Sequence, residues 1–264
     1  MSSVRGRAWF DRITRGGKPV AGLPPSVLAA DCTIDGHAVR AIVVVPDPNA
    51  RFPLARNGDL GIDEGFGLAR AVRGTPANSA ILAIVDVPGQ AFGTREEAVG
   101  LQRSLAASAD AYIRARRGGH PVYALVVGKA ISGAFLAHGL QAGWIGALDD
   151  PGIEVHVMSE AAVARVTRME RADIARLAHE IPATARDIHS FATFGAIDRI
   201  FEVGDPDAPS DVDLQNVVHA LAEALRTPEL GLRNPRERLD RPGALHSRAT
   251  ARRVREELQA QWDV

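Results

Sequence analysis

Cysteine is nearly missing from this chain, and its scarcity excludes several kinds of chemistry. Cys32 stands alone among 264 residues, so no internal disulfide and no cysteine-based zinc cluster can form. The histidine and acidic residues also lack the spacing of a metal site. A single thiol is typical of a protein kept in a reducing compartment, and we expect a cytoplasmic protein with no bound metal.

An excess of charge and long apolar runs are missing too. The 31 lysine and arginine residues nearly balance the 32 acidic residues, so the basic footprint of nucleic-acid binding is absent. No stretch reaches the ~20 apolar residues needed to span a membrane, and residues 1–10 lack the apolar run of a signal peptide. We expect neither a nucleic-acid partner nor a membrane association.

Hydrophobic residues, at 46% of the sequence, are numerous enough for a substantial core. Two buried-strand patterns, over residues 80–85 and 121–127, are each followed by a glycine turn and a helix, over residues 95–117 and 134–142. A β-branched run at residues 38–45 precedes them. Repeated strand, turn and helix units predict an α/β fold with a parallel sheet and right-handed crossovers.

The remaining pattern is mostly helical. Periodicity predicts helices over residues 62–72, 161–167, 172–179, 183–194 and 214–226, with Ser159 as an N-cap, and strands over residues 153–158 and 196–203. Residues 232–262 are rich in arginine and predict a terminal helix that faces solvent or another subunit.

The first glycine turn reads Asp86-Val-Pro-Gly-Gln-Ala-Phe-Gly93 and lies between a buried strand and a helix. Gly89 and Gly93 let the backbone turn sharply and let another molecule approach closely. Amides at such a junction point outward unpaired, and the helix dipole adds positive charge, so the turn suits a developing oxyanion. Most Pro-Gly turns at strand ends are nevertheless only turns.

The second turn reads Gly128-Lys-Ala-Ile-Ser-Gly-Ala134, and its helix start is almost bare of side chains. Tight packing of the helix against its strand is one explanation for the small residues. The other is the pairing of the two turns, because neighbouring strands would bring N–H groups toward one point. That is the geometry of an oxyanion hole.

These two motifs, in this order and at this separation, resemble those of the crotonase superfamily, in its carboxyltransferase branch. Segments 157–163 (VMSEAAV) and 194–199 (FGAIDR) are also similar to those that follow in that branch. The sequence most resembles gamma subunits of biotin-independent malonate decarboxylase over residues 30–225. The resemblance implies a crotonase-like ββα spiral over residues 31–230, with an N-terminal extension at 1–30 and a helical C-terminal tail at 231–264.

The resemblance also implies a reaction. Malonyl carried as a thioester on an acyl carrier protein would lose carbon dioxide, and backbone N–H groups would hold the enolate until it is protonated. The carrier would bear a coenzyme A-derived, phosphopantetheine-type group, with no cofactor bound directly by this chain. A beta subunit of the same fold would supply the other half of the site, so we expect this chain to be inactive alone.

The site residues follow from the motifs. The expected oxyanion donors are the backbone N–H groups of Gly89, Gln90, Ser132, Gly133 and Ala134. Carboxyltransferases often have Gly-Gly where this chain has Ser132-Gly133, which leaves the assignment of single amides open. Lys129 and Ile131 are the expected substrate contacts, although Lys129 is also compatible with a plain surface lysine.

Other functions remain open at this point. A serine hydrolase would place Ser132 at a nucleophile elbow, with an acid and a histidine drawn from Asp149 or Asp187 and from His179, His189 or His219. A second alternative is a non-catalytic scaffold subunit. Transfer of the carboxyl group to biotin would use the same fold and turns as direct decarboxylation. A hydride-transfer enzyme is not expected, because no Gly-x-Gly-x-x-Gly follows a strand.

Overall fold

The computed structural model describes residues 3–158, 160–181 and 184–262. Its centre is an eight-stranded sheet in the order β1-β2-β3-β4-β5-β6-β8, and the short β7 pairs with the far end of β5. The strands are β1 (Lys18–Pro19), β2 (Val27–Ile34), β3 (His37–Val44), β4 (Ala80–Val87), β5 (Val122–Ile131), β6 (Trp144–Asp149), β7 (Val155–His156) and β8 (Arg199–Glu202).

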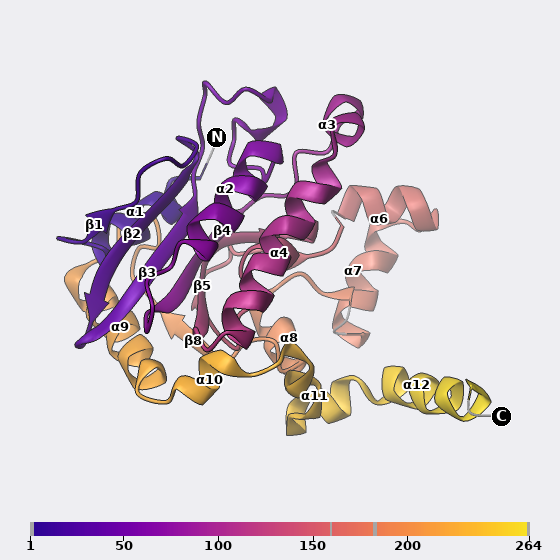
Figure 1. Ribbon diagram of the computed structural model, residues 1–264. Helices are drawn as coiled ribbons and strands as arrows, with labels where there is room; N and C mark the ends of the chain where they lie inside the picture. Colours follow the sequence, from indigo (N-terminus) through magenta and orange to yellow (C-terminus); the bar gives the residue numbers. More distant parts are fainter. Residues whose placement is uncertain (1–2, 159, 182–183, 263–264) are drawn as a thin grey trace.

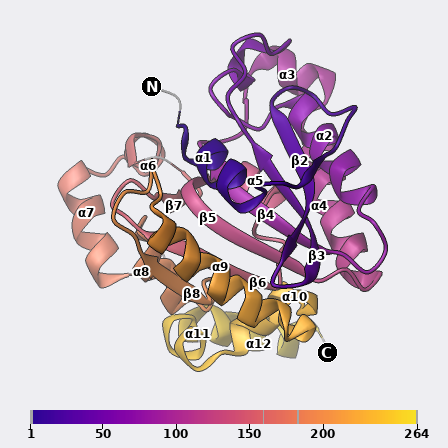
Figure 2. The same cartoon turned by 90° about the vertical axis from the view of Figure 1, so that its left-hand side faces the viewer.

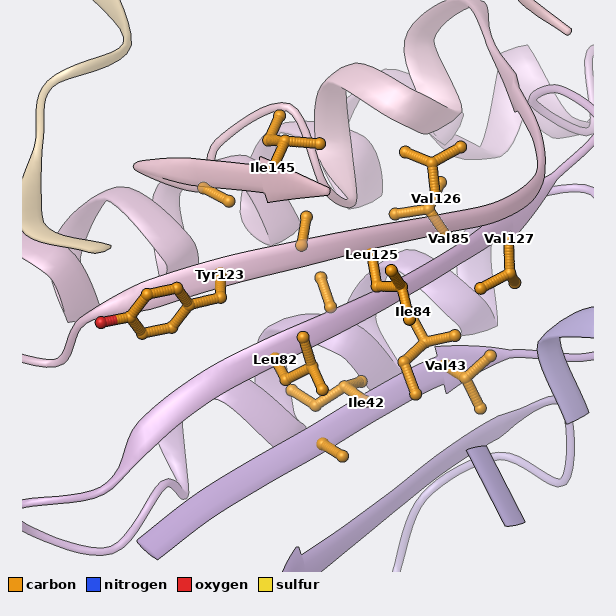
Figure 3. Close-up of a cluster of buried hydrophobic side chains, with 14 of the residues drawn as sticks. Ile42, Val43, Leu82, Ile84, Val85, Tyr123, Leu125, Val126, Val127 and Ile145 are labelled. Carbon is orange, nitrogen blue, oxygen red and sulfur yellow. The ribbon is translucent and has the colours of Figure 1, made fainter. Parts of the chain in front are cut away.

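The pairs β3–β4, β4–β5, β5–β6 and β6–β8 are parallel, whereas β1–β2 and β2–β3 are antiparallel and form one edge of the sheet. The predicted parallel α/β sheet is therefore confirmed. Parallel strands covered on both faces read as continuous apolar runs, and every residue of β4 is buried. Figure 3 shows side chains of β3, β4, β5 and β6 packed together in this core.

Helices cover both faces of the sheet. α2 and α4 lie on one face, and α1 and α9 lie on the other (Figures 1 and 2). The α-helices are α1 (Arg5–Ile13), α2 (Ile62–Arg73), α3 (Thr94–Val99), α4 (Leu101–Arg117), α5 (Ser132–Ala137), α6 (Glu160–Thr167), α7 (Arg171–Glu180), α8 (Ile188–Thr193), α9 (Asp211–Leu225), α10 (Pro228–Leu232), α11 (Pro242–Ser247) and α12 (Ala249–Trp262). Among the described residues, none of these helices is long and apolar enough to cross a membrane.

Some expected elements differ in extent. The single helix expected over residues 95–117 is divided at Gly100, whose φ of 108° lies in the left-handed region that ends a helix. The helix expected over residues 134–142 starts earlier and stops at Ala137, and Gly139 follows with a φ of 111°. At Gly100 the glycine sets the boundary, whereas α5 ends because His138 is already in extended conformation, one residue before Gly139.

Further differences lie after β5. The strand expected over residues 153–158 shortens to the two residues of β7, and the helix expected over residues 183–194 shortens to α8, which begins after the capping residue Asp187. β6 was not predicted. Ser159, the expected N-cap of α6, lies outside the described residues.

The two ends of the chain relate differently to this body. The boundary expected at residue 30 falls inside β2, and the preceding α1 packs against β3, β4 and β5. The boundary expected at residue 230 falls inside α10. Beyond it α12 has no buried residue and extends away from the sheet (Figure 1).

Candidate active site

The two glycine turns lie side by side at the carboxyl ends of β4 and β5. These strands are parallel neighbours, and Val87 at the end of one pairs with Ala130 near the end of the other. A side chain then joins the turns: the Gly133 N–H donates to the Gln90 side-chain oxygen, with N and Oε1 3.1 Å apart. The carboxyl edge of a parallel sheet is where α/β proteins build ligand sites.

The first turn is fixed by a neighbouring segment. The Leu60 N–H donates to the Gly89 carbonyl at 2.8 Å, and the Ala91 N–H donates to the Leu60 carbonyl at 3.0 Å. No described residue accepts a hydrogen bond from the N–H of Gly89 or Gln90. A β-carbon added at Gly89 would meet a single atom within 4 Å, the Asp59 Oδ1 at 3.3 Å. A side chain at position 89 would therefore press on the Asp59 carboxyl group, which lies directly beside the first turn.

A buried carboxylate holds the second turn in place. Asp86 is 6% exposed and accepts from the Gly6 N–H at 3.0 Å and from the Lys129 N–H at 3.2 Å. A β-carbon at Gly128 would lie 2.1 Å from the Asp86 Oδ1, a distance that no side chain can occupy. Tight packing, one of the two explanations that the sequence left open for the small residues of this turn, therefore accounts for Gly128.

The second turn itself is a sharp change from strand to helix. Ser132 has a φ of 58°, the left-handed conformation that costs a residue with a β-carbon roughly 1–2 kcal/mol. Ile131 precedes it in extended conformation, and the start of α5 follows with Gly133 half-buried and Ala134 fully buried. This geometry presents the first amides of α5 beside the Gln90 side chain.

The end of α5 is tied to β4. His138 is fully buried, and its Nε2 donates to the Ile84 carbonyl at 2.9 Å, while its Nδ1 receives the Tyr112 hydroxyl at 2.9 Å. The Nε2 must carry the proton, because a carbonyl only accepts. Burial lowers the His138 pKa to about 4, so the ring is neutral at physiological pH.

A cleft of about 270 Å³ opens beside the first turn. Its charged residues are Asp59, Asp86 and Lys129. Burial raises the pKa of Asp59, and the charge of Lys129 opposes that shift. The cleft therefore brings the Lys129 cation and the Asp59 carboxyl group, whose pKa is raised, next to the first glycine turn.

A cluster of charges anchors Lys129 from the other side. Its ammonium lies 3.7 Å from the Glu154 Oε1, and the other Glu154 oxygen accepts from Arg186 at 2.9 Å. The His156 Nε2 lies 3.1 Å from that same oxygen. Burial alone would raise the pKa of Glu154, but the His156 contact and the two cations outweigh it, so the net shift is downward.

Sequence reasoning found Lys129 but missed Asp59, Glu154, His156 and Arg186. Asp59 lies in a segment rich in Pro, Asn and Gly. It precedes Asp86, the first residue of the motif that it faces, by 27 positions. The signal available was weak: a carboxylate in a loop that follows a strand. Only the bridge between Leu60 and Gln90 reveals the contact.

The described residues do not assemble a hydrolase triad at Ser132. Asp187 caps α8 by accepting from the Ser190 N–H, and His219 lies beside Glu223 on the exposed side of α9. The side chain of His179 lies outside what the structure describes. His189 and Asp149 do pair at 2.9 Å. In the described part of the chain, however, no histidine bonds to the Ser132 hydroxyl.

Comparisons with known proteins show which family this chain resembles. A chain of a Pseudomonas malonate decarboxylase hetero-tetramer in complex with coenzyme A is 46% identical, with a TM-score of 0.85, and the match covers 98% of this chain and 99% of that one. A chain of the Pseudomonas MdcD-MdcE hetero-dimer is 45% identical, with a TM-score of 0.81 and coverage of 99% and 100%.

A curated relative and a more distant structure extend the comparison. The malonyl-S-ACP:biotin-protein carboxyltransferase MADD of Malonomonas rubra is 36% identical over 186 residues, which is 66% of this chain. The match spans 61% of the length of MADD. Transcarboxylase 12S is 22% identical with a TM-score of 0.62, covering 85% of this chain and 40% of that one, and it shares the fold. The expected crotonase-like carboxyltransferase fold is thereby confirmed.

Both expected turn motifs lie within the region that matches a protein family. The family model for the malonate decarboxylase gamma subunit matches residues 55–262, which include the two turns, the cleft residues Asp59, Asp86 and Lys129, and the C-terminal helices. This chain belongs to the family of malonate decarboxylase gamma subunits.

Proposed function

We propose that this chain, together with a beta subunit, decarboxylates malonyl-S-acyl carrier protein to acetyl-S-acyl carrier protein. The observation that carries the proposal is that the two glycine turns lie side by side, joined through Gln90 and Gly133, next to a cleft lined by the Lys129 side chain. Loss of carbon dioxide needs no nucleophile. It needs stabilisation of the enolate oxygen and a place for the departing carboxylate, and this arrangement suits both.

Within that reaction, the N–H groups of Gly89 and Gln90 are the first pair of proposed donors. No described residue accepts a hydrogen bond from either of them, and a β-carbon added at Gly89 would meet only the Asp59 Oδ1 within 4 Å. The second group comprises the amides of Ser132, Gly133 and Ala134. The Gly133 N–H is bonded to the Gln90 side chain, so that side chain must move before the amide can serve an oxyanion.

Lys129 is the proposed partner for a negative group of the substrate. Its side chain is 44% exposed and lines the cleft, and its ammonium lies 3.7 Å from Glu154. A cation there can neutralise the malonyl carboxylate, or a phosphate of the carrier's phosphopantetheine-type group. Ile131, half-buried just before the second turn, is the proposed apolar contact for the substrate.

The partners are proposed from the relatives. The Pseudomonas hetero-dimer supports a beta subunit, and its coenzyme A complex supports recognition of a coenzyme A-derived group. MADD acts on malonyl-S-ACP, which supports an acyl carrier protein as the substrate carrier. With one crotonase-like unit in this chain, we propose that it is inactive without its partner and works in the cytoplasm.

Carboxyl transfer to biotin is the second candidate, because MADD is a biotin-protein carboxyltransferase. The test is a complex reconstituted from this chain, its beta subunit and malonyl-loaded acyl carrier protein, assayed for carbon dioxide release and acetyl thioester formation alone and with an added biotinyl protein, each with and without avidin. Direct decarboxylation predicts release without the biotinyl protein, unchanged by avidin. Acetyl thioester formation only when the biotinyl protein is present, and blocked by avidin, would establish the biotin route instead, and no acetyl thioester under either condition would overturn both.

The role of the first turn has its own test. Gly89→Val would place a side chain against the first turn, with its β-carbon 3.3 Å from the Asp59 Oδ1. We expect more than a 100-fold loss of carbon dioxide release with an intact complex, since one oxyanion donor is worth about 10²–10³. Gly204→Val is the matched control, because the nearest atom to a β-carbon there is 3.9 Å away. Full activity of Gly89→Val would make this subunit a scaffold.

A further inference from the structure

We propose that Asp59 is the catalytic acid that protonates the enolate carbon after carbon dioxide has left. The inference rests on the proposed decarboxylation, which leaves a carbanion equivalent and requires a proton donor. Backbone amides can hold the enolate oxygen, but they do not supply a proton to carbon. The donor must therefore be a side chain or water within the cleft.

Geometry places the Asp59 carboxyl group beside the first turn. The next residue, Leu60, exchanges two backbone hydrogen bonds with the turn, to the Gly89 carbonyl and from the Ala91 N–H. The Asp59 Oδ1 lies 3.3 Å from the position of a β-carbon on Gly89. A substrate bound against Gly89 therefore lies beside this carboxyl group, and we infer that the α-carbon of a thioester held by the first turn comes within its reach.

The other charged residues of the cleft are unsuited to the role. Asp86 is buried, and its two oxygens are already engaged as acceptors by the amides of Gly6 and Lys129. The Lys129 ammonium is anchored by Glu154 and serves better to neutralise a carboxylate. Asp59 alone of the three combines partial burial, a carboxyl group that faces the cleft, and a pKa raised by desolvation.

The step balances without a further reactant. The C–C bond to the carboxylate breaks, carbon dioxide leaves, and its bonding electrons form the enolate. The enolate carbon then takes the proton of the Asp59 carboxyl group, the thioester carbonyl re-forms, and Asp59 is left as a carboxylate. A proton from solvent restores it. A protonated Asp59 also avoids repelling the incoming malonyl carboxylate, which an ionised one would do.

The first experiment uses the reconstituted complex with Asp59→Asn, which keeps the shape and removes the proton. We expect kcat for acetyl thioester formation to fall roughly 100-fold or more, with KM changed less than about threefold, as for loss of a general acid. Asp59→Glu should recover part of that rate. The matched control is Asp63→Asn, a carboxylate paired with Arg51 at 2.6 Å on the surface of α2.

The pH profile gives a second readout. An acid must be protonated to act, so kcat of the wild-type complex should fall as pH rises through the pKa of Asp59. Lys129 and Asp86 line the same cleft as the Asp59 carboxyl group, and both are retained in the Asp59→Asn variant. The alkaline limb assigned to Asp59 should therefore vanish in Asp59→Asn and persist in Asp63→Asn.

A third readout runs the protonation in reverse, without decarboxylation. In D₂O the wild-type complex should exchange the methyl hydrogens of acetyl-S-carrier, because the Asp59 carboxylate removes the proton that it donates in the forward direction. We expect Asp59→Asn to lose this exchange more than tenfold. Carbon dioxide release at the wild-type rate from a folded Asp59→Asn complex, with exchange intact, would overturn the assignment. Failure of the wild-type complex to release carbon dioxide would instead overturn the proposed function.

Discussion

The turn after β4 is less tightly packed at Gly89 than the turn after β5 is at Gly128, and the second glycine of the turn after β5, Gly133, is already hydrogen-bonded. At Gly89 an added β-carbon would meet one atom within 4 Å, the Asp59 Oδ1 at 3.3 Å. At Gly128 it would meet the buried Asp86 carboxylate at 2.1 Å. The Gly133 N–H is occupied by Gln90.

This difference indicates that the glycines of the two similar turns have different roles. In the proposed site Gly89 leaves room for a ligand, whereas Gly128 lets a buried carboxylate hold α1 and β5 together. The Gln90 side chain connects the turns, because its backbone belongs to one and its amide oxygen binds the other. Substitutions in the two turns should therefore have separable effects on stability and on activity.

The largest effect should come from Gly128→Ala. Its β-carbon displaces the Asp86 carboxylate, and the buried Gly6 and Lys129 amides lose their acceptor. Overpacking and unsatisfied donors together should lower the free energy of unfolding by roughly 3–5 kcal/mol, measured by urea denaturation. Gly133→Ala is the control, since its β-carbon would be 3.4 Å from the nearest atom. Equal losses in the two variants would contradict the division of tasks.

Next in size is the pH dependence contributed by His138, which ties the helix of the second turn to the strand of the first. Its pKa falls from 6.5 to about 4 on burial, so the unfolded chain binds the proton more readily. The stabilising contribution is complete above pH 6.5 and is lost as pH falls toward 4. The loss should reach on the order of 3 kcal/mol.

His138→Gln isolates that contribution. The amide can still donate to the Ile84 carbonyl, but it does not titrate, so the slope of unfolding free energy between pH 6.5 and pH 4 should flatten relative to the wild type. His219→Gln, at an exposed surface pair with Glu223, should leave the slope unchanged. A wild-type slope in His138→Gln would show that another group carries the pH dependence.

The meeting of the two turns was predictable from sequence because it depends on local rules. Apolar runs 80–85 and 121–127, each followed by a glycine turn and a helix, specify parallel neighbours whose carboxyl ends coincide. The length of each helix was less predictable. Gly100 stands in a helical pattern, and only its left-handed conformation shows that the helix divides there.

Features that depend on tertiary contact were beyond sequence reasoning. β6 carries Gly146, a weak strand signal, yet this glycine makes room for the Phe201 and Trp144 rings. The bond from Gly133 to Gln90 joins residues 43 positions apart. The proximity of Asp59 to the first turn likewise depends on the bridge made by Leu60.

A smaller effect should follow from Gln90→Ala, which keeps the backbone donor of the first turn and frees the Gly133 N–H. Loss of one hydrogen bond should cost about 1 kcal/mol of stability. If the freed amide binds the substrate oxygen, KM for the malonyl thioester should fall by up to about tenfold, because the substrate no longer displaces the side chain. Gln141→Ala, on the exposed loop after α5, is the control. A raised KM would instead make Gln90 a substrate contact.

The smallest effect should come from Ser132→Gly, and it decides between the oxyanion and hydrolase interpretations. Glycine relieves the left-handed strain at φ 58° but adds backbone freedom to the unfolded chain, so the two terms should cancel to within about 1 kcal/mol. The Ser132 N–H is retained, so carbon dioxide release by the complex should stay within about twofold. A nucleophilic Ser132 would lose nearly all activity in this variant. A nucleophilic Ser132 would also make the wild type react stoichiometrically with a fluorophosphonate. We expect no such reaction, because no histidine bonds to the Ser132 hydroxyl in the described part of the chain.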